Sequence, residues 1–362
     1  MDNSHDRDSY DTIFVMVDIK NWPALDFIKF ICVTVMILVH AHIMLIINYD
    51  WFLNANSFFY KATERFMFVG LFLMILPMFA GTVFRINDNF ELRKIAKLAI
   101  FLILIGFFMN LITWGWNNVF LWNVLQFIGL SFLIISFLKN HYSDKAIIFL
   151  SLLVIFAAEP LRHSFARFGH PYWLNIFFGV NNGQTFWPLF PWLGLVGLGF
   201  IFADYYIRYK DTDIKKFNLI SAAIGVLLIA ISILRKEAIP LLDPRFILGS
   251  SVFQPKIGFV LASIGFFCVF VSAANTFFNK AKFRKYGIVN SYSKGILWIY
   301  IFQMFASYNL AILIKKFFPI DGPSLAYFIL PVAMIILSWF VGAMSIRLFA
   351  EKRLVITLKR VK

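Results

Sequence analysis

Long apolar stretches separated by short polar segments follow one another along most of the chain. Crossing a bilayer as a helix takes about 20 consecutive apolar residues. Ten stretches approach that length, although the fifth is short; they lie at residues 24–48, 66–84, 96–114, 120–138, 146–159, 187–207, 217–234, 257–278, 288–312 and 326–347. The pattern predicts an all-α integral membrane protein with about ten transmembrane helices.

Polar segments flank this apolar body. We expect residues 1–22 to form a polar cytoplasmic tail, residues 23–350 a single ten-helix domain, and residues 351–362 a basic cytoplasmic tail. The first 20 residues are polar and acidic, with no apolar run behind a basic start. This composition favours a tail over a cleaved signal peptide.

Lys and Arg are distributed unevenly between the two sets of connecting segments. If the N-terminus is cytoplasmic, the cytoplasmic segments hold 22 of these residues and the outer segments hold 10. Lys29 and Lys294 lie within spans. Cytoplasmic loops of membrane proteins are enriched in positive charge, so this bias predicts that both termini are cytoplasmic.

Composition agrees with a membrane protein. The 362 residues are 60% hydrophobic and 19% aromatic, with a mean hydropathy of +0.77 and a formal net charge of +15. Because the positive charges lie in short loops between apolar spans, membrane orientation explains them and no nucleic-acid partner is expected. Both cysteines, Cys32 and Cys268, fall inside apolar spans, which implies no disulfide framework.

The first apolar stretch, Pro23–Asn48, carries ionisable side chains at membrane depth. Such groups are costly there and usually functional. Lys29 and His40 are 11 residues apart, close to three helical turns, so they share one face and lie roughly 16 Å apart along the axis. Asp26 continues that face, whereas His42 points roughly the opposite way.

Two interpretations remain open for each of these residues. A neutral imidazole at His40 could accept a proton from an attacking hydroxyl or amine, or it could bond to a neighbouring helix for packing. Lys29 and Asp26 could meet a phosphorylated ligand that enters from the cytoplasm. Alternatively, Lys29 could extend to the headgroups and pair with Asp26.

Further candidates lie in the connecting segments. Arg85, Arg93, Lys94 and Lys97 could clamp phosphates at the cytoplasmic mouth, or simply set the orientation of the chain. On the outer side, aromatic, amide and imidazole groups in 114–118 and 159–186 would suit a sugar, although an interfacial aromatic belt would look the same. The candidate acceptor-binding residues are Glu64, Trp116, His163 and His170.

The sequence shows no motif for a metal or a nucleotide. His163 and His170 are seven residues apart, with no Cys or third His near them, so we expect no metal. Neither a Walker A loop nor a Gly-x-Gly-x-x-Gly segment occurs, which leaves no sign of ATP-driven pumping.

Several segments together resemble known membrane acyltransferases. Lys29 and His40 resemble the Arg/Lys-x10-His motif of the acyltransferase-3 family. Other segments that resemble that family are Leu25–Lys29, Met78–Arg85 and Lys94–Lys97. Those that are more similar to the related heparan-glucosaminide N-acetyltransferase branch are Val124–Leu130, Phe190–Gly194 with Gly197 and Gly199, and Asn290-Ser291. The likeness extends over nearly all of the chain after residue 22.

The resemblance implies about ten helices and a cytoplasmic acyl-CoA donor whose acyl group passes to an extracytoplasmic acceptor. It implies a catalytic role for His40 and a donor-binding or structural role for Lys29. One position departs from the pattern, because Gly295 and Trp298 stand where the family often has Tyr and His.

These observations predict an acyl-CoA-dependent O- or N-acyltransferase that moves an acyl group, expected to be acetyl, to a hydroxyl or amine of a glycan or glycolipid. Acetyl-CoA or another acyl-CoA would be the donor, and membrane lipid would surround the protein. We expect it in a bacterial cytoplasmic membrane, acting in cell-envelope polysaccharide modification. The alternative is a transporter or flippase for a lipid-linked or anionic solute, with the same polar stripe along its path.

Overall fold

The computed structural model describes residues 22–48, 75–86, 91–167, 172–180, 185–236, 254–278, 287–317 and 326–360. These residues form α-helices, with one 3₁₀ helix, η4 (Trp116–Asn118). Over these ranges there is no β-strand, and the one β-bridge pairs Trp122 with Thr185. The all-α prediction is therefore confirmed.

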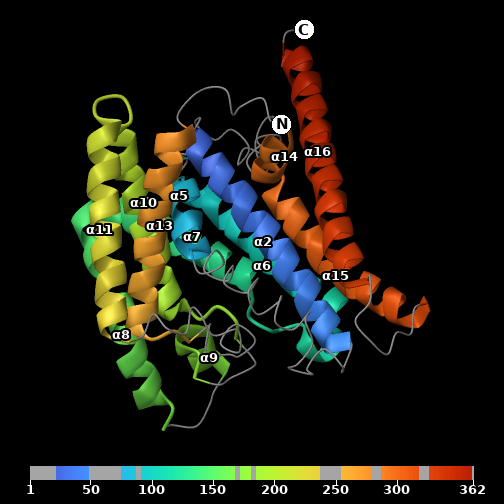
Figure 1. The fold of residues 1–362 in the computed structure, drawn as a ribbon, viewed down its shortest axis with the longest axis horizontal. Helices are drawn as coiled ribbons and strands as arrows, with labels where there is room; N and C mark the ends of the chain where they lie inside the picture. The colour runs from blue at the N-terminus through green and yellow to red at the C-terminus, as the bar shows by residue number, and fades with distance from the viewer. Residues whose placement is uncertain are drawn as a thin grey trace, which may run out of the picture. The chain divides into compact units, whose positions relative to one another are not determined.

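Eight helices of the described part are long and apolar enough to cross a membrane. Their spans are Pro23–Ala41, Leu92–Trp114, Val124–His141, Leu189–Tyr209, Ile214–Leu234, Ile257–Phe278, Ile296–Leu313 and Ile329–Leu348. A shorter apolar helix, α5 (Leu76–Ile86), falls on the predicted second span. The chain is thus an integral membrane protein built from helices (Figure 1).

The described residues fall into two compact units. Unit 1 contains α5, α6 (Leu92–Trp114), η4, α7 (Val124–His141), α8 (Asp144–Phe165), α9 (Tyr172–Phe178), α10 (Leu189–Tyr209), α11 (Ile214–Leu234) and most of α13 (Ile257–Phe278). Unit 2 contains α2 (Pro23–Asn48), α14 (Gly287–Lys294), α15 (Ile296–Phe317) and α16 (Ala326–Arg360).

In unit 1, α10 is the central helix and packs closely against α5 and α8, while α6 packs against α7. Glycines make the α5–α10 crossing tight. A Cβ atom at Gly199 would lie 1.8 Å from the Met78 carbonyl oxygen, and one at Gly81 would lie 1.9 Å from the Val196 carbonyl oxygen. Thr82 Oγ1 donates a hydrogen bond across the crossing to the Gly199 carbonyl, 3.0 Å away.

In unit 2, α2 packs against α14, α15 and α16. The predicted ninth span is interrupted, because α14 ends at Lys294 and α15 begins at Ile296. Gly295 lies between them, where a Cβ atom would come within 2.7 Å of the Gly342 Cα on α16. The three C-terminal helices thus pack against α2, and α16 also approaches the junction of α14 and α15 closely.

The helices differ from the predicted spans in two further places. The predicted fifth span, 146–159, lies within a longer helix, because α8 runs from Asp144 to Phe165. The Ser143 side chain caps its start by accepting from the Ala146 amide, and the helix continues past Pro160 although the apolar run has ended. At the C-terminus, α16 extends to Arg360, into the segment predicted as a tail.

Candidate functional site

His40 lies on α2, and its partner comes from α15 of the same unit. Gln303 Nε2 lies 2.7 Å from His40 Nδ1. Gln303 is completely buried and His40 is half-buried. The Tyr300 ring, one turn before Gln303, meets the imidazole edge to face, with 6.4 Å between ring centroids. Two side chains of α15 thus fix the orientation of the imidazole.

Lys29 occupies the same helix three turns earlier. Its side chain is 1% exposed, and Nζ lies 3.6 Å from Asp26 Oδ1 without forming a hydrogen bond. Ser293 Oγ of α14 donates a hydrogen bond to the same carboxylate oxygen of Asp26. The buried lysine therefore has its counter-charge on its own helix, and that carboxylate is in turn anchored to α14.

The face of α2 that carries Lys29 and His40 is directed toward α14 and α15. Asp26, beside Lys29, bonds to α14, and His40 contacts α15. A continuous α2 and these contacts agree with the predicted common face. Lys29 does not extend to a surface in this structure, because its ammonium group is buried beside Asp26.

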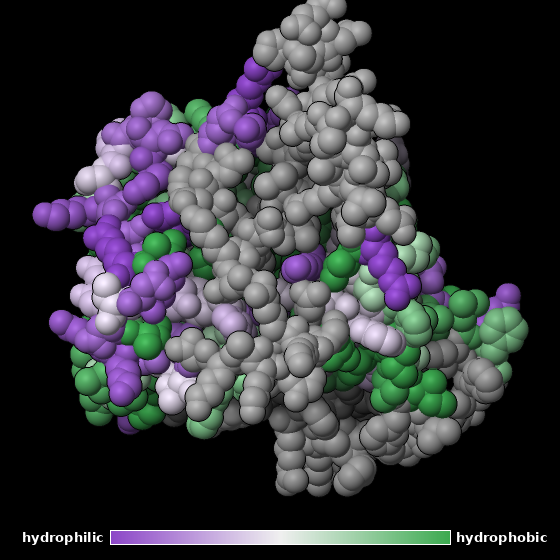
Figure 2. All heavy atoms as spheres, turned by 90° about the horizontal axis from the view of Figure 1, so that it is seen from above, coloured by the Kyte–Doolittle hydropathy of each residue, from purple (hydrophilic) through white to green (hydrophobic). Residues whose placement is uncertain are grey.

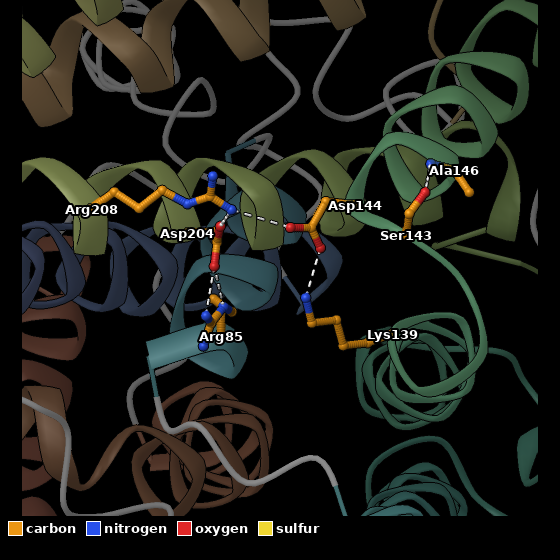
Figure 3. Close-up of polar contacts among 7 residues, drawn as sticks. All are labelled: Arg85, Lys139, Ser143, Asp144, Ala146, Asp204 and Arg208. Carbon is orange, nitrogen blue, oxygen red and sulfur yellow. Dashed lines mark hydrogen bonds and ion pairs between the residues drawn. The ribbon is translucent and has the colours of Figure 1, made fainter.

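In unit 1, Arg85 belongs to an ionic cluster that joins four helix ends (Figure 3). Arg85 Nη2 and Nε donate to Asp204 Oδ1 of α10, at 2.6 and 2.9 Å. Arg208 Nη2 lies 2.5 Å from Asp204 Oδ2 and 3.3 Å from Asp144 Oδ2. Lys139 Nζ lies 2.7 Å from Asp144 Oδ1. Arg85 is thus engaged by Asp204.

The other residues predicted to contact phosphate lie at the start of α6. Arg93 and Lys97 are exposed, and Lys94 Nζ lies 2.8 Å from Glu91 Oε2. The ionic cluster is at the same end of unit 1, since α5 and α6 are consecutive and Arg85 holds the last turns of α10. Figure 2 looks onto the end at which α10 and α11 are joined, and hydrophilic residues gather there. Lysines and arginines outnumber the carboxylates among the described residues of this end, which we call the basic face of unit 1; they include Arg93, Lys94, Lys97, Lys139 and Arg208.

The predicted acceptor-binding residues that the structure describes are both at the surface. Trp116 of η4 is 79% exposed, and the His163 side chain is 77% exposed with Nε2 3.9 Å from Glu159 Oε1 on the same helix. Glu64 and His170 lie outside the described residues, as does the side chain of His42.

The sequence analysis did not single out several residues at these sites. Asp204, Ser293 and Gln303 are each polar side chains within or beside an apolar stretch. For Asp204 the signal was present, because it is a carboxylate near the end of a predicted span. Ser293 and Gln303 carried no such signal, because isolated hydroxyl and amide groups usually bond between membrane helices.

Two chemical capacities follow from these arrangements. An oriented imidazole inside an apolar helix can exchange a proton with a bound substrate. A cationic helix start can bind phosphates. Among the described side chains, no three or more His, Cys, Asp or Glu residues gather in a way that could hold a metal ion.

Comparison with known proteins gives one result. The family model described as heparan-alpha-glucosaminide N-acetyltransferase, catalytic, matches residues 22–234, which is more than half of the chain. The match includes α2 with Lys29 and His40, and the helices of unit 1 through α11. No curated protein and no solved structure matches the chain.

Proposed function

Because the chain belongs to the heparan-alpha-glucosaminide N-acetyltransferase catalytic family, we propose that it transfers an acyl group, acetyl by preference, from cytoplasmic acyl-CoA to a hydroxyl or amine on a glycan or glycolipid across the membrane. Family membership makes it a membrane acyltransferase. The oriented imidazole of His40 inside an apolar, family-matched helix is the observation that supports the rest of the proposal. A relationship to the wider acyltransferase-3 family is part of the same proposal.

In the proposed reaction, His40 is the general base. It takes the proton of the acceptor hydroxyl or amine as that oxygen or nitrogen attacks the thioester carbonyl carbon. The carbon–sulfur bond then breaks, and the imidazolium returns its proton to the leaving thiolate. The products are the acylated acceptor and CoA, with His40 restored to its neutral form.

The donor and the acceptor are on opposite sides of the membrane. We assign the phosphates of the donor to the basic face of unit 1, where Arg93, Lys94 and Lys97 begin α6. A cytoplasmic position of this face agrees with the 22-to-10 distribution of Lys and Arg, from which we also propose cytoplasmic termini. The proposed location is a bacterial cytoplasmic membrane, with a cell-envelope glycan as acceptor.

Purified protein in liposomes provides the test. Acetyl-CoA labelled in the acetyl group is supplied on one side, and membrane extract or a model amino sugar on the other. We expect release of free CoA together with labelled acceptor, and both should require His40. Movement of a solute without consumption of CoA would contradict the proposal and would favour the transporter.

Charge removal at the start of α6 tests the donor assignment. We expect the triple change Arg93→Gln, Lys94→Gln and Lys97→Gln to raise the apparent KM for acyl-CoA while kcat changes little, because each side chain removed is a contact with phosphate. Steady-state kinetics at varied donor concentration measures both quantities.

A matched control removes three cations from the same face. Lys210, Lys215 and Lys216 are exposed around the connection between α10 and α11. Changing all three to Gln lowers the net charge by the same amount, so it should leave the donor KM nearly unchanged. Equal effects of the two triple changes would mean that the α6 residues act only through the electrostatic field of the whole basic face, and not as direct contacts with phosphate.

A further inference from the structure

Gln303 is the one described hydrogen-bonding partner of His40 that the structure identifies, and it lies outside the family-matched residues 22–234. Its side chain is completely buried, so water does not compete for the contact with Nδ1. The second polar atom of its amide, Oε1, is also buried and has no hydrogen-bond partner. A buried amide with one end on the imidazole and one end unsatisfied calls for an explanation beyond packing.

The end of the amide that faces Nδ1 determines what His40 can do. If the amide nitrogen donates to Nδ1, the proton of the neutral imidazole is on Nε2, and that nitrogen cannot accept another. If Oε1 accepts from Nδ1–H, then Nε2 carries a lone pair and can act as a base. The two ends of a carboxamide have nearly the same size and shape, so a half turn exchanges them within the same packing.

We infer that Gln303 is the positioning residue of His40, accepting Nδ1–H through Oε1 so that Nε2 faces the reacting group as the proton acceptor. This inference rests on the proposed function, because only general-base chemistry requires that tautomer. The half turn gives the buried Oε1 a donor and places the amide nitrogen on the side of Gln303 where the structure shows no partner. As His40 becomes imidazolium, Nδ1–H remains bonded to the same oxygen, and the bond strengthens with the charge.

An uncharged acceptor suits this place in the fold. Among the described side chains, the titratable group in ring contact with His40 is Tyr300, and Lys29 lies three turns away on α2 beside its own carboxylate. A carboxylate partner would add a charge to an apolar site, which is costly at membrane depth. An amide orients the ring without that cost.

Two variants at position 303 test the inference through kinetics. Gln303→Leu keeps the volume but removes the acceptor, so kcat should fall about 10- to 100-fold while the donor KM stays unchanged, a smaller loss than that of the base itself. Gln303→Glu keeps an oxygen that can accept Nδ1–H, and an ionised carboxylate stabilises the imidazolium formed in the reaction; it should therefore retain far more of the kcat than Gln303→Leu, with the cost of the added charge seen as lower stability. Asn309→Leu is the control, because this amide of α15 bonds to the Phe305 carbonyl of its own helix; its kcat should not change.

The tautomer can also be observed without turnover. In protein labelled with ¹⁵N-histidine and reconstituted in lipid, the His40 signals are identified by their loss in His40→Ala. We expect a protonated Nδ1 and a bare Nε2 in the unmodified protein, and a shift toward the opposite tautomer in Gln303→Leu. This measurement keeps the inference testable even if Gln303→Leu folds poorly.

The outcomes separate this inference from the proposed function. A bare Nδ1 in the unmodified protein, or an inactive Gln303→Glu together with a fully active Gln303→Leu, would overturn the role of Gln303. If His40→Ala left transfer intact, the proposed function would fail, while the tautomer measurement would still report whether Oε1 holds Nδ1–H. Transfer that needs His40 but not Gln303 would remove this inference alone.

Discussion

We expect His40→Ala to reduce acyl transfer about 100-fold or more, the usual contribution of a positioned general base. Binding of acyl-CoA should survive, because the cations assigned to its phosphates belong to other helices, at the start of α6. Turnover is measured as CoA release with labelled acceptor, and donor binding by titration of the purified protein. A loss of kcat with unchanged donor affinity identifies a group that acts in the chemical step.

His42→Ala is the matched control. The residue lies two positions later on α2, so helical geometry turns its Cα–Cβ bond about 200° away from that of His40. General damage from removing a polar group would affect both variants similarly. Loss of transfer in His42→Ala with normal transfer in His40→Ala would show that the wrong face of α2 has been assigned to the reaction.

Asp204→Asn should destabilise unit 1 strongly. The Asp204 side chain is 8% exposed and accepts from Arg85, which is 14% exposed. Breaking one partner of a buried ion pair typically costs about 3–5 kcal/mol, because the remaining charge loses its buried counter-charge. A lower temperature of unfolding in detergent, or loss of monodisperse protein, measures the effect.

Asp144→Asn provides the comparison, since it removes a carboxylate from the same cluster. Its partners are more exposed, at 28% for Lys139 and 62% for Arg208, and exposed ion pairs contribute about 0–1 kcal/mol. We also expect the double change Arg85→Met with Asp204→Leu to recover much of the lost stability, because it removes both buried charges, while the exposed Arg208 keeps its pair with Asp144. Equal losses at Asp204 and Asp144 would contradict a special role for the buried pair.

Helix identity and membrane placement could be predicted from the sequence, because both depend on local features. Runs of apolar residues predict spans regardless of what packs against them, and the separation of 11 residues places Lys29 and His40 on one face of a helix whatever its neighbours are. The continuous α2 agrees with that geometry. The extent of α8 was missed because hydropathy marks membrane depth, whereas a helix can continue into polar sequence.

Partners that come from distant parts of the chain could not be predicted in this way. His40 and Gln303 are separated by 263 positions, and Arg85 and Asp204 by 119. Nothing in the local sequence around Arg85 distinguishes a phosphate contact from half of an ion pair. The structure shows the ion pair, because Arg85 has two hydrogen bonds to a buried carboxylate.

The long separation between Arg85 and Asp204 has a consequence for biosynthesis. When α5 leaves the ribosome, the Asp204 carboxylate that accepts from Arg85 has not yet been made, because α10 follows more than a hundred residues later. Until then the crossing of α5 and α10 cannot form, and the end of α5 lacks this buried contact. We therefore expect the cell's membrane quality-control proteases to degrade nascent chains that end before α10 faster than chains that reach Tyr209.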